Sequence, residues 1–212
     1  MNQKDQAGNR VVVVGICGSI RRGSYTRMAV QIALRGAQEL GAQTGLIDLK
    51  DYHLVFCDGK EDESTLPEDV FKLRREVSRA GGIILGTPEY HGSFSGVLKN
   101  ALDLMGFDEI EGKMIGLVGV SGGALGAVHA LNSLRAVGRA LHAWVIPEQA
   151  SIPEAWKVFD ESGTLKDSDL EKRLKEVGRQ VARFAYLHTS EKAQEFLRAW
   201  EGAPLNPGGA KE

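Results

Sequence analysis

The chain has 212 residues, of which 42% are hydrophobic and 25% are charged. This composition supports a substantial buried core, which excludes a wholly disordered chain, a collagen-like fibre and a disulfide-stapled miniprotein. The net charge of −2 does not supply the strongly basic surface that is typical of nucleic-acid or membrane-surface binding.

Several sequence features together indicate a soluble, cytoplasmic protein. The first ten residues are polar, and no apolar run approaches the roughly 20 residues needed to cross a bilayer. The two cysteines, Cys17 and Cys57, form no CxxC pair, which favours free thiols in a reducing compartment. The five histidines show no metal-ligand spacing. We therefore expect no metal site, no membrane association and no nucleic-acid partner.

The first predicted element is a buried strand at residues 11–14, a continuous run of valines. A glycine-rich turn leads into a helix at residues 25–40, where apolar residues recur at helical spacing. Strands and helices then alternate. Further strands are expected at residues 44–49, 82–86, 113–120 and 143–146, and further helices at residues 67–79, 95–105, 124–141, 169–187 and 191–200.

This alternation predicts βαβ crossovers, and therefore a doubly wound α/β protein with five parallel strands and helices on both faces. Beyond Pro147 the pattern becomes irregular until residue 163. We expect a disordered leader at residues 1–9, one domain at residues 10–188, a C-terminal helix at residues 189–201 and a disordered tail at residues 202–212.

Ligands of open parallel sheets bind beyond the carboxyl ends of the strands. The loop after the first strand contains Ser19, Arg21, Arg22 and Ser24 directly before a helix, where free backbone N–H groups and the helix dipole favour an anion. It is neither a Walker A loop nor a GxGxxG loop. The alternatives are a phosphate site and a plain turn with exposed arginines.

The loop after the third strand reads Thr-Pro-Glu-Tyr-His-Gly-Ser at residues 87–93. It places a carboxylate, a phenol ring and an imidazole at a strand end, and its glycine permits close approach of a ligand. These side chains suit the face and edge of an aromatic ligand. The alternative is a turn that packs on the following helix.

The loop after the fourth strand reads Gly-Val-Ser-Gly-Gly at residues 119–123 and matches the GxSxG pattern of a hydrolase nucleophile elbow at Ser121. A triad needs an acid and then a histidine after later strands, whereas only one short strand follows, and His142 and His188 are poorly placed. We favour a loop whose backbone amides approach the edge of a ligand.

Taken together, three motifs resemble the NADPH-dependent FMN reductase family, which includes bacterial quinone, chromate and azo-dye reductases. The motifs are Gly-Ser-Ile-Arg-Arg-Gly-Ser at residues 18–24, the segment from Thr-Pro-Glu-Tyr-His to Leu-Lys-Asn-Ala-Leu-Asp at residues 87–103, and Val-Ser-Gly-Gly at residues 120–123. The similarity extends over residues 10–187. It implies a flavodoxin-like fold with strand order 2-1-3-4-5.

The resemblance also implies noncovalent FMN, with NADPH or NADH as the second substrate. It assigns the FMN phosphate to Ser19, Arg21 and Ser24. It assigns the isoalloxazine ring to two groups of residues, Pro88, Glu89, Tyr90, His91 and Gly92 along one segment, and Ser121, Gly122 and Gly123 at the pyrimidine edge. The family commonly has Asn in place of His91.

We therefore expect an NAD(P)H-dependent flavin oxidoreductase that passes hydride to FMN and on to a small-molecule acceptor, such as free flavin, a quinone, an azo compound, a metal oxyanion or ferric iron. In such an enzyme the flavin carries the chemistry and no catalytic side chain is required. The alternatives are a flavodoxin-type electron carrier or flavin-binding module and, less favoured, the serine hydrolase. Homodimers or homotetramers are expected, with a free face of the helix at residues 95–105 as one contact surface.

Overall fold

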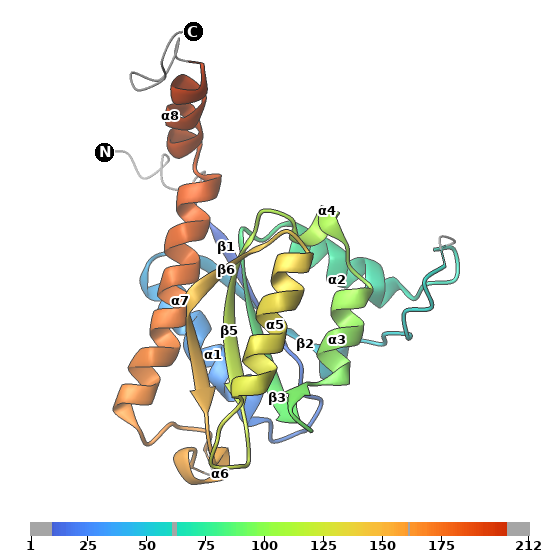
Figure 1. Ribbon diagram of the computed structural model, residues 1–212, viewed down its shortest axis with the longest axis vertical. Helices are drawn as coiled ribbons and strands as arrows, with labels where there is room; N and C mark the ends of the chain where they lie inside the picture. The colour runs from blue at the N-terminus through green and yellow to red at the C-terminus, as the bar shows by residue number, and fades with distance from the viewer. Residues whose placement is uncertain (1–9, 61–62, 161, 203–212) are drawn as a thin grey trace, which may run out of the picture.

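The computed structural model describes residues 10–60, 63–160 and 162–202, which form a three-layer α/β sandwich (Figure 1). The leader expected at residues 1–9 and nearly all of the expected tail lie outside the described residues. The domain boundaries remain expectations.

The central sheet contains five parallel strands in the order β2-β1-β3-β5-β6, so the order 2-1-3-4-5 expected for the parallel strands is confirmed. A sixth strand, β4, is a two-residue antiparallel addition to the end of β3. The strands are β1 (Val12–Cys17), β2 (Gln43–Asp48), β3 (Gly82–Tyr90), β4 (Ser93–Phe94), β5 (Met114–Val120) and β6 (Trp144–Ile152).

Helices cover both faces of this sheet, as expected. The longer helices are α1 (Tyr25–Glu39), α2 (Glu68–Ser78), α3 (Gly96–Asp103), α5 (Val128–Ala140), α7 (Ser168–Thr189) and α8 (Glu191–Glu201). The short elements are the 3-10 helix η1 (Leu49–Asp51), α4 (Phe107–Ile110) and α6 (Ala155–Val158). Helices α1 and α7 pack on one face, and α2, α3 and α5 pack on the other.

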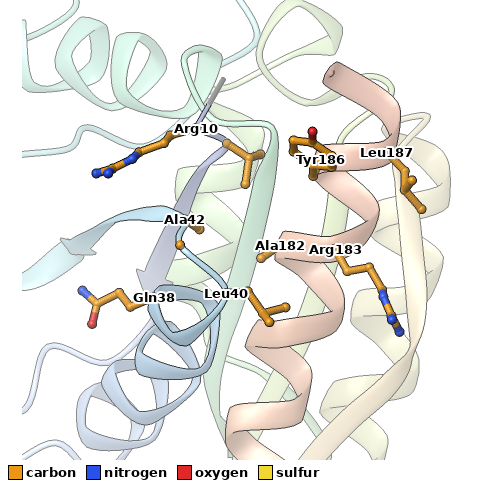
Figure 2. A pocket seen from close by; sticks show the side chains of 10 residues that line it. Arg10, Gln38, Leu40, Ala42, Ala182, Arg183, Tyr186 and Leu187 are labelled. Atoms are coloured by element: carbon orange, nitrogen blue, oxygen red, sulfur yellow. The ribbon is translucent and has the colours of Figure 1, made fainter. Parts of the chain in front are cut away.

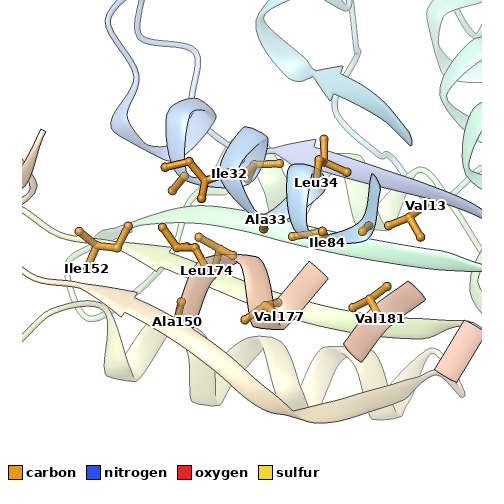
Figure 3. Packing of buried hydrophobic residues seen from close by; sticks show 14 of the residues in the cluster. Val13, Ile32, Ala33, Leu34, Ile84, Ala150, Ile152, Leu174, Val177 and Val181 are labelled. Carbon is orange, nitrogen blue, oxygen red and sulfur yellow. The ribbon is translucent and has the colours of Figure 1, made fainter. Parts of the chain in front are cut away.

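Two apolar clusters hold these layers together because successive strand residues point to opposite faces. On β3, Ile84 joins the cluster under α1 and α7, whereas Ile83 and Leu85 join the cluster under α2, α3 and α5. Figure 3 shows the first cluster, in which Val177 and Val181 of α7 lie against the sheet.

Helices α1 and α7 also touch each other at two glycines. A Cβ atom on Gly178 would overlap the carbonyl group of Ala33, and one on Gly36 would overlap the carbonyl group of Lys175. These clashes are with backbone atoms, which cannot move aside like a flexible side chain. The two glycines therefore set how closely the helices pack, and they fix α1, whose N-terminus enters the candidate site.

The sequence analysis was wrong about the fifth parallel strand. A short strand at residues 143–146 was expected, but β6 continues to Ile152. Pro147 lies where the register between β5 and β6 shifts, and a strand tolerates proline at such an irregularity. The Arg135 guanidinium donates hydrogen bonds to the carbonyl oxygens of Ile146 (2.9 Å) and Pro147 (2.8 Å), so this irregular backbone is satisfied.

Other boundaries also differ from expectation. Strand β1 continues to Cys17, three residues past its expected end at residue 14. Strand β3 extends past the expected end at residue 86 to Tyr90, because Thr87 and Pro88 pair with β5 and the next two residues pair with β4. Helix α5 begins at Val128, four positions later than expected, and leaves a longer loop after β5.

The helix expected at residues 95–105 offers little free apolar surface. Leu98, Ala101, Leu102, Leu104 and Met105 are all buried within this chain. Among the described residues, no helix combines the length and the apolar character needed to cross a membrane.

Candidate functional site

The candidate site lies at the carboxyl ends of β1, β3 and β5, and its first wall is the loop from β1 to α1. Ser24 caps α1, and its hydroxyl oxygen accepts a hydrogen bond from the Arg27 backbone N–H at 3.2 Å. Ser19 and Ser24 are buried, whereas Arg21 is exposed. The first turn of α1 reads Tyr-Thr-Arg-Met and carries no carboxylate, so the positive end of the helix dipole is available for an anion.

Arg27 holds this loop in place from outside the cavity. Its guanidinium donates to the carbonyl oxygens of Arg22 (2.8 Å) and Arg21 (3.3 Å) and to the carboxylate of Asp48 at the end of β2. The hydrogen bond to Asp48 raises the pKa of Arg27 further above its already high value. Arg27 is therefore a fixed structural cation, which leaves Arg21 as the arginine that lines the cavity.

The loop after β1 is also joined to the segment after β3. The Gly18 N–H donates to the Gly86 carbonyl oxygen at 2.8 Å, and the Ser95 hydroxyl donates to the Gly18 carbonyl oxygen at 2.6 Å. A Cβ atom on Gly18 would come within 2.7 Å of Leu98. The two predicted binding segments therefore approach as closely as a glycine allows.

The end of β3 supplies the second wall. Pro88 is buried, Glu89 is half-buried and Tyr90 is exposed. The Glu89 carboxylate accepts a hydrogen bond from the Ala130 N–H in the first turn of α5 at 3.1 Å. The Tyr90 ring lies 5.8 Å from the guanidinium carbon of Arg21, which links the two walls.

His91 and Gly92 form the two-residue turn between β3 and β4. Both have positive φ values, 51° and 75°, as a tight type I′ hairpin turn requires. Asn, Asp and His adopt this left-handed conformation more readily than other non-glycine residues. Asn and His therefore both suit this position through the backbone. The His91 side chain is exposed, and neither residue lines the cavity described below.

The third wall combines the loop after β5 with α6. The Ser121 N–H donates to the Ile152 carbonyl oxygen at 2.9 Å, and the Ser121 carbonyl oxygen accepts from the Ala155 N–H at 3.0 Å. The Gly123 carbonyl oxygen accepts from the Glu154 N–H at 3.1 Å. Tyr25 of α1 stacks on Phe159 with ring centroids 5.3 Å apart. These contacts hold α6 against the loop after β5 and against the start of α1.

These walls enclose a cavity of about 230 Å³. Its lining includes Ser19, Arg21, Ser24, Pro88, Glu89, Tyr90, Ser121 and Gly122, all of which the sequence analysis named. Gly123 does not line it. A Cβ atom on Gly23 or Gly122 would meet no atom within 4 Å, so the backbone at both positions is open to a ligand. The cavity thus combines hydroxyl groups and a guanidinium group near a helix N-terminus with an exposed aromatic ring and open glycine backbone.

The sequence analysis missed Tyr25, Thr26, Ala155 and Trp156, which also line the cavity. Tyr25 and Thr26 follow directly from the position of the α1 N-terminus. Trp156 lies on the four-residue helix α6, which is too short to produce a helical pattern in the sequence.

The serine hydrolase alternative finds no support in this geometry. The Ser121 hydroxyl accepts a hydrogen bond from the Gly123 N–H at 3.0 Å. His142 precedes β6 at the amino ends of the strands, whereas Ser121 follows β5 at the carboxyl ends. The His142 ring stacks on Phe107, and His188 packs against Trp144, the first residue of β6. Within the described ranges, no group of three or more His, Cys, Asp or Glu residues is arranged to hold a metal ion.

The strand order, the helices on both faces and the polar loops at the carboxyl ends define a flavodoxin-like α/β protein. An archaeal flavodoxin structure aligns with 82% of this chain and 97% of its own, at a TM-score of 0.56 and 12% identity. The flavoenzyme NAD(P)H:(acceptor) oxidoreductase FerB from Paracoccus denitrificans aligns with 84% of this chain and 98% of its own, at a TM-score of 0.65 and 22% identity. At these identities the structures establish the fold.

The family follows from the sequence comparisons. A model of the NADPH-dependent FMN reductase family matches residues 11–157, so the chain belongs to this family. It is 31% identical over 182 residues to the NADPH-dependent FMN reductase ArsH of Shigella flexneri, a match that covers 84% of this chain and 69% of that protein. It is 30% identical over 174 residues to the FMN-dependent NADPH-azoreductase of Staphylococcus aureus, covering 80% and 92%. The expected class, an NAD(P)H-dependent flavin oxidoreductase, is confirmed.

Proposed function

We propose that the cavity holds FMN, with its phosphate at the N-terminus of α1. The Ser19 and Ser24 hydroxyls and the free N–H groups of the first helical turn are the donors for the phosphate oxygens. Arg21 adds a charge-assisted hydrogen bond, and the helix dipole favours the same negative charge. The observation that carries this proposal is that Ser19, Arg21 and Ser24 line one cavity together with Pro88, Glu89, Tyr90, Ser121 and Gly122.

The isoalloxazine ring would extend from the phosphate along the end of β3. Tyr90 supplies an exposed aromatic face there, and the open backbone at Gly122 supplies an N–H donor for the pyrimidine edge. The Gly123 N–H already donates to the Ser121 hydroxyl oxygen at 3.0 Å, so Gly123 supports this loop from outside the cavity. The loop is held by its hydrogen bonds with α6. Preorganised donors of this kind stabilise negative charge that develops at the edge of a ligand during a reaction.

Bound FMN supplies the hydride and electron transfer chemistry. The protein would bind the phosphate, orient the ring and leave one ring face open. That face would accept the nicotinamide of NADPH or NADH and then a small-molecule acceptor such as free flavin, a quinone, an azo compound, a metal oxyanion or ferric iron. Alternating use of one face predicts ping-pong kinetics, and initial-rate lines that intersect instead of running parallel would contradict it.

The remaining expectations belong to the same proposal. We place the protein in the cytoplasm, with residues 10–188 as the FMN-binding domain, residues 189–201 as an additional helix, and a homodimer or homotetramer as the assembly. We expect His91 and Gly92 to affect FMN through the hairpin backbone that presents Tyr90.

A comparison of FMN with riboflavin tests the phosphate assignment. Riboflavin has the same ring without the phosphate, so it cannot use the donors at the α1 N-terminus. We expect titration of the flavin-free protein, followed by flavin fluorescence, to give at least tenfold tighter binding for FMN. Equal affinity for the two flavins would show that the phosphate does not bind in this cavity.

A further inference from the structure

The last helix of the described chain presents an apolar face that the other described residues leave exposed. In α8, Ala193, Phe196, Leu197 and Trp200 recur at the spacing of one helix face. Phe196 is 73% exposed and Trp200 is 58% exposed, and no residue of α8 is buried. Figure 1 shows α8 extending past the end of α7, away from the body of the protein.

Such a helix needs a partner to be stable in water. Helix α8 has 11 residues, and isolated helices shorter than about 12 to 15 residues are only marginally stable. Most helical stability in proteins comes from packing of an amphipathic face. Within the described residues, the exposed face of α8 lacks the packing that stabilises most protein helices.

The same chain carries a largely apolar groove of about 820 Å³ near the amino end of β1, whereas the candidate FMN site lies at the carboxyl ends of the strands. The end of α1, the start of β1 and the last turns of α7 form its walls. Figure 2 shows Leu40 and Ala182 on facing walls, with Tyr186 near one end. Leu40, Tyr186 and Leu187 are 56%, 41% and 51% exposed, so the groove lacks a cover within the described residues.

The helix and the groove of one copy do not cover each other. Ser190 separates α7 from α8 by a single residue with extended backbone, and α8 then extends beyond the end of α7 (Figure 1). No residue of α8 lines the groove.

We propose that α8 of one copy docks in this groove of a second copy, and that the exchange is reciprocal. A two-fold axis then covers both grooves and both helices, and the assembly is closed. The apolar contact carries this docking, because both signs of charge border the apolar face of α8, with Glu201 on one side and Lys192 on the other. Glu201 can face Arg10 and Arg183 of the groove.

The area is sufficient for a specific but modest interface. Fully buried Phe and Trp side chains each remove 150 to 250 Å² from water, so with the exposed fractions of Phe196 and Trp200 each helix contributes roughly 250 Å² of aromatic surface. Two helices and the matching surface of two grooves together bury about 1,000 Å², the lower limit of specific interfaces. The assembly should therefore depend on protein concentration.

Light scattering of the full chain over a range of concentrations tests the helix surface. Phe196→Glu combined with Trp200→Glu should halve the mass of the assembly, whether a tetramer becomes a dimer or a dimer becomes a monomer. The matched control, Glu195→Ala combined with Arg198→Ala, changes the polar face of the same helix and should leave the mass unchanged. An unchanged mass in the apolar-face variant, or a monomeric wild type at the highest concentration, would overturn the proposal.

Cross-linking between copies tests whether α8 docks in the groove, and it does not depend on measuring the mass of a variant. In a Cys57→Ser background, which removes the exposed thiol, a chain with Phe196→Cys is mixed with a chain with Leu187→Cys and oxidised. The proposal predicts a disulfide-linked heterodimer. A Glu195→Cys chain mixed with the same partner should cross-link at least tenfold less. Equal cross-linking from both helix positions, or none from Phe196→Cys, would contradict docking in this groove.

Discussion

The Ser95 hydroxyl donates a hydrogen bond of 2.6 Å to the Gly18 carbonyl oxygen and so joins two segments of the candidate site that are far apart in the sequence. Ser95 also caps α3, because its hydroxyl oxygen accepts from the Leu98 N–H at 3.2 Å. Its own N–H donates to the Thr87 hydroxyl oxygen at 3.0 Å. One buried serine therefore fixes the loop between β1 and α1 relative to the segment that presents Tyr90.

Ser95→Ala should lower the free energy of unfolding by about 2 to 4 kcal/mol, since it removes a helix cap and leaves the buried Gly18 carbonyl oxygen without this donor. Urea denaturation measures the loss. Ser190→Ala is the matched control, because Ser190 is also buried and caps α8, and among the described residues its hydroxyl bonds only within that helix cap. It should cost about 1 kcal/mol. Equal losses would show that the bond to Gly18 contributes nothing.

Arg21→Ala should weaken FMN binding by about 1.5 to 3 kcal/mol, the contribution of a hydrogen bond to a charged group, which corresponds to about 10- to 150-fold in Kd. Titration of flavin-free protein with FMN measures the change. Arg22→Ala is the control, because Arg22 is also exposed but does not line the cavity. Unchanged affinity in Arg21→Ala would remove this side chain from the site.

Gly178→Ala should destabilise the protein by about 1 to 3 kcal/mol, because the new methyl group would overlap the Ala33 carbonyl group at the contact between α7 and α1. Thermal and urea unfolding measure the effect. Gly96→Ala tests the same substitution where a Cβ atom meets nothing within 4 Å, so its stability should be unchanged or slightly higher. A Gly178→Ala protein as stable as the wild type would contradict the close crossing of these helices.

Burial raises the pKa of the Cys17 thiol, and its thiol donates to the Ser19 carbonyl oxygen at 3.6 Å. A pKa raised by folding stabilises the native state below the unfolded pKa of the thiol, and this contribution is lost as the pH rises through the folded value. The wild type should therefore lose more unfolding free energy than Cys17→Ala between neutral and alkaline pH. Parallel pH profiles for the two proteins would contradict this effect.

The same burial predicts selective thiol chemistry. Cys57 is exposed and Cys17 is buried, so a thiol reagent at neutral pH should modify Cys57 in the native protein and both cysteines after unfolding. Rapid modification of Cys17 in the native state would show that the loop after β1 opens.

The main features of the fold could be predicted from the sequence because they depend on local patterns. Three local patterns each indicate structure within a few residues. They are the valine run at the start of β1, the apolar spacing in α1 and α7, and the glycines after strands. Ser24 and Thr26 were both candidate caps of α1 from the sequence, and the structure assigns the cap to Ser24. Ser19 and Arg21 lie close to it in sequence. The loop after β1 could therefore be predicted as a candidate site, and the ligand that it binds is part of the proposed function.

Features that depend on distant residues could not be predicted. Strand β3 continues through Pro88 because β5 pairs alongside it, and β6 passes Pro147 because Arg135 satisfies the irregular backbone. Trp156 enters the cavity because hydrogen bonds from α6 to Ser121 and Gly123 fold that segment back over the site. None of these contacts produces a pattern among neighbouring residues in the sequence.

The most direct test of the central claim is an anaerobic titration of the purified, FMN-loaded protein with NADPH, followed by its visible absorption spectrum. A reductase of this family should retain FMN at the cavity, lose the flavin absorption as NADPH is added, and regain it when a quinone is supplied. A protein that does not bind FMN, or that holds FMN whose spectrum neither NADPH nor NADH changes, would contradict the proposed function.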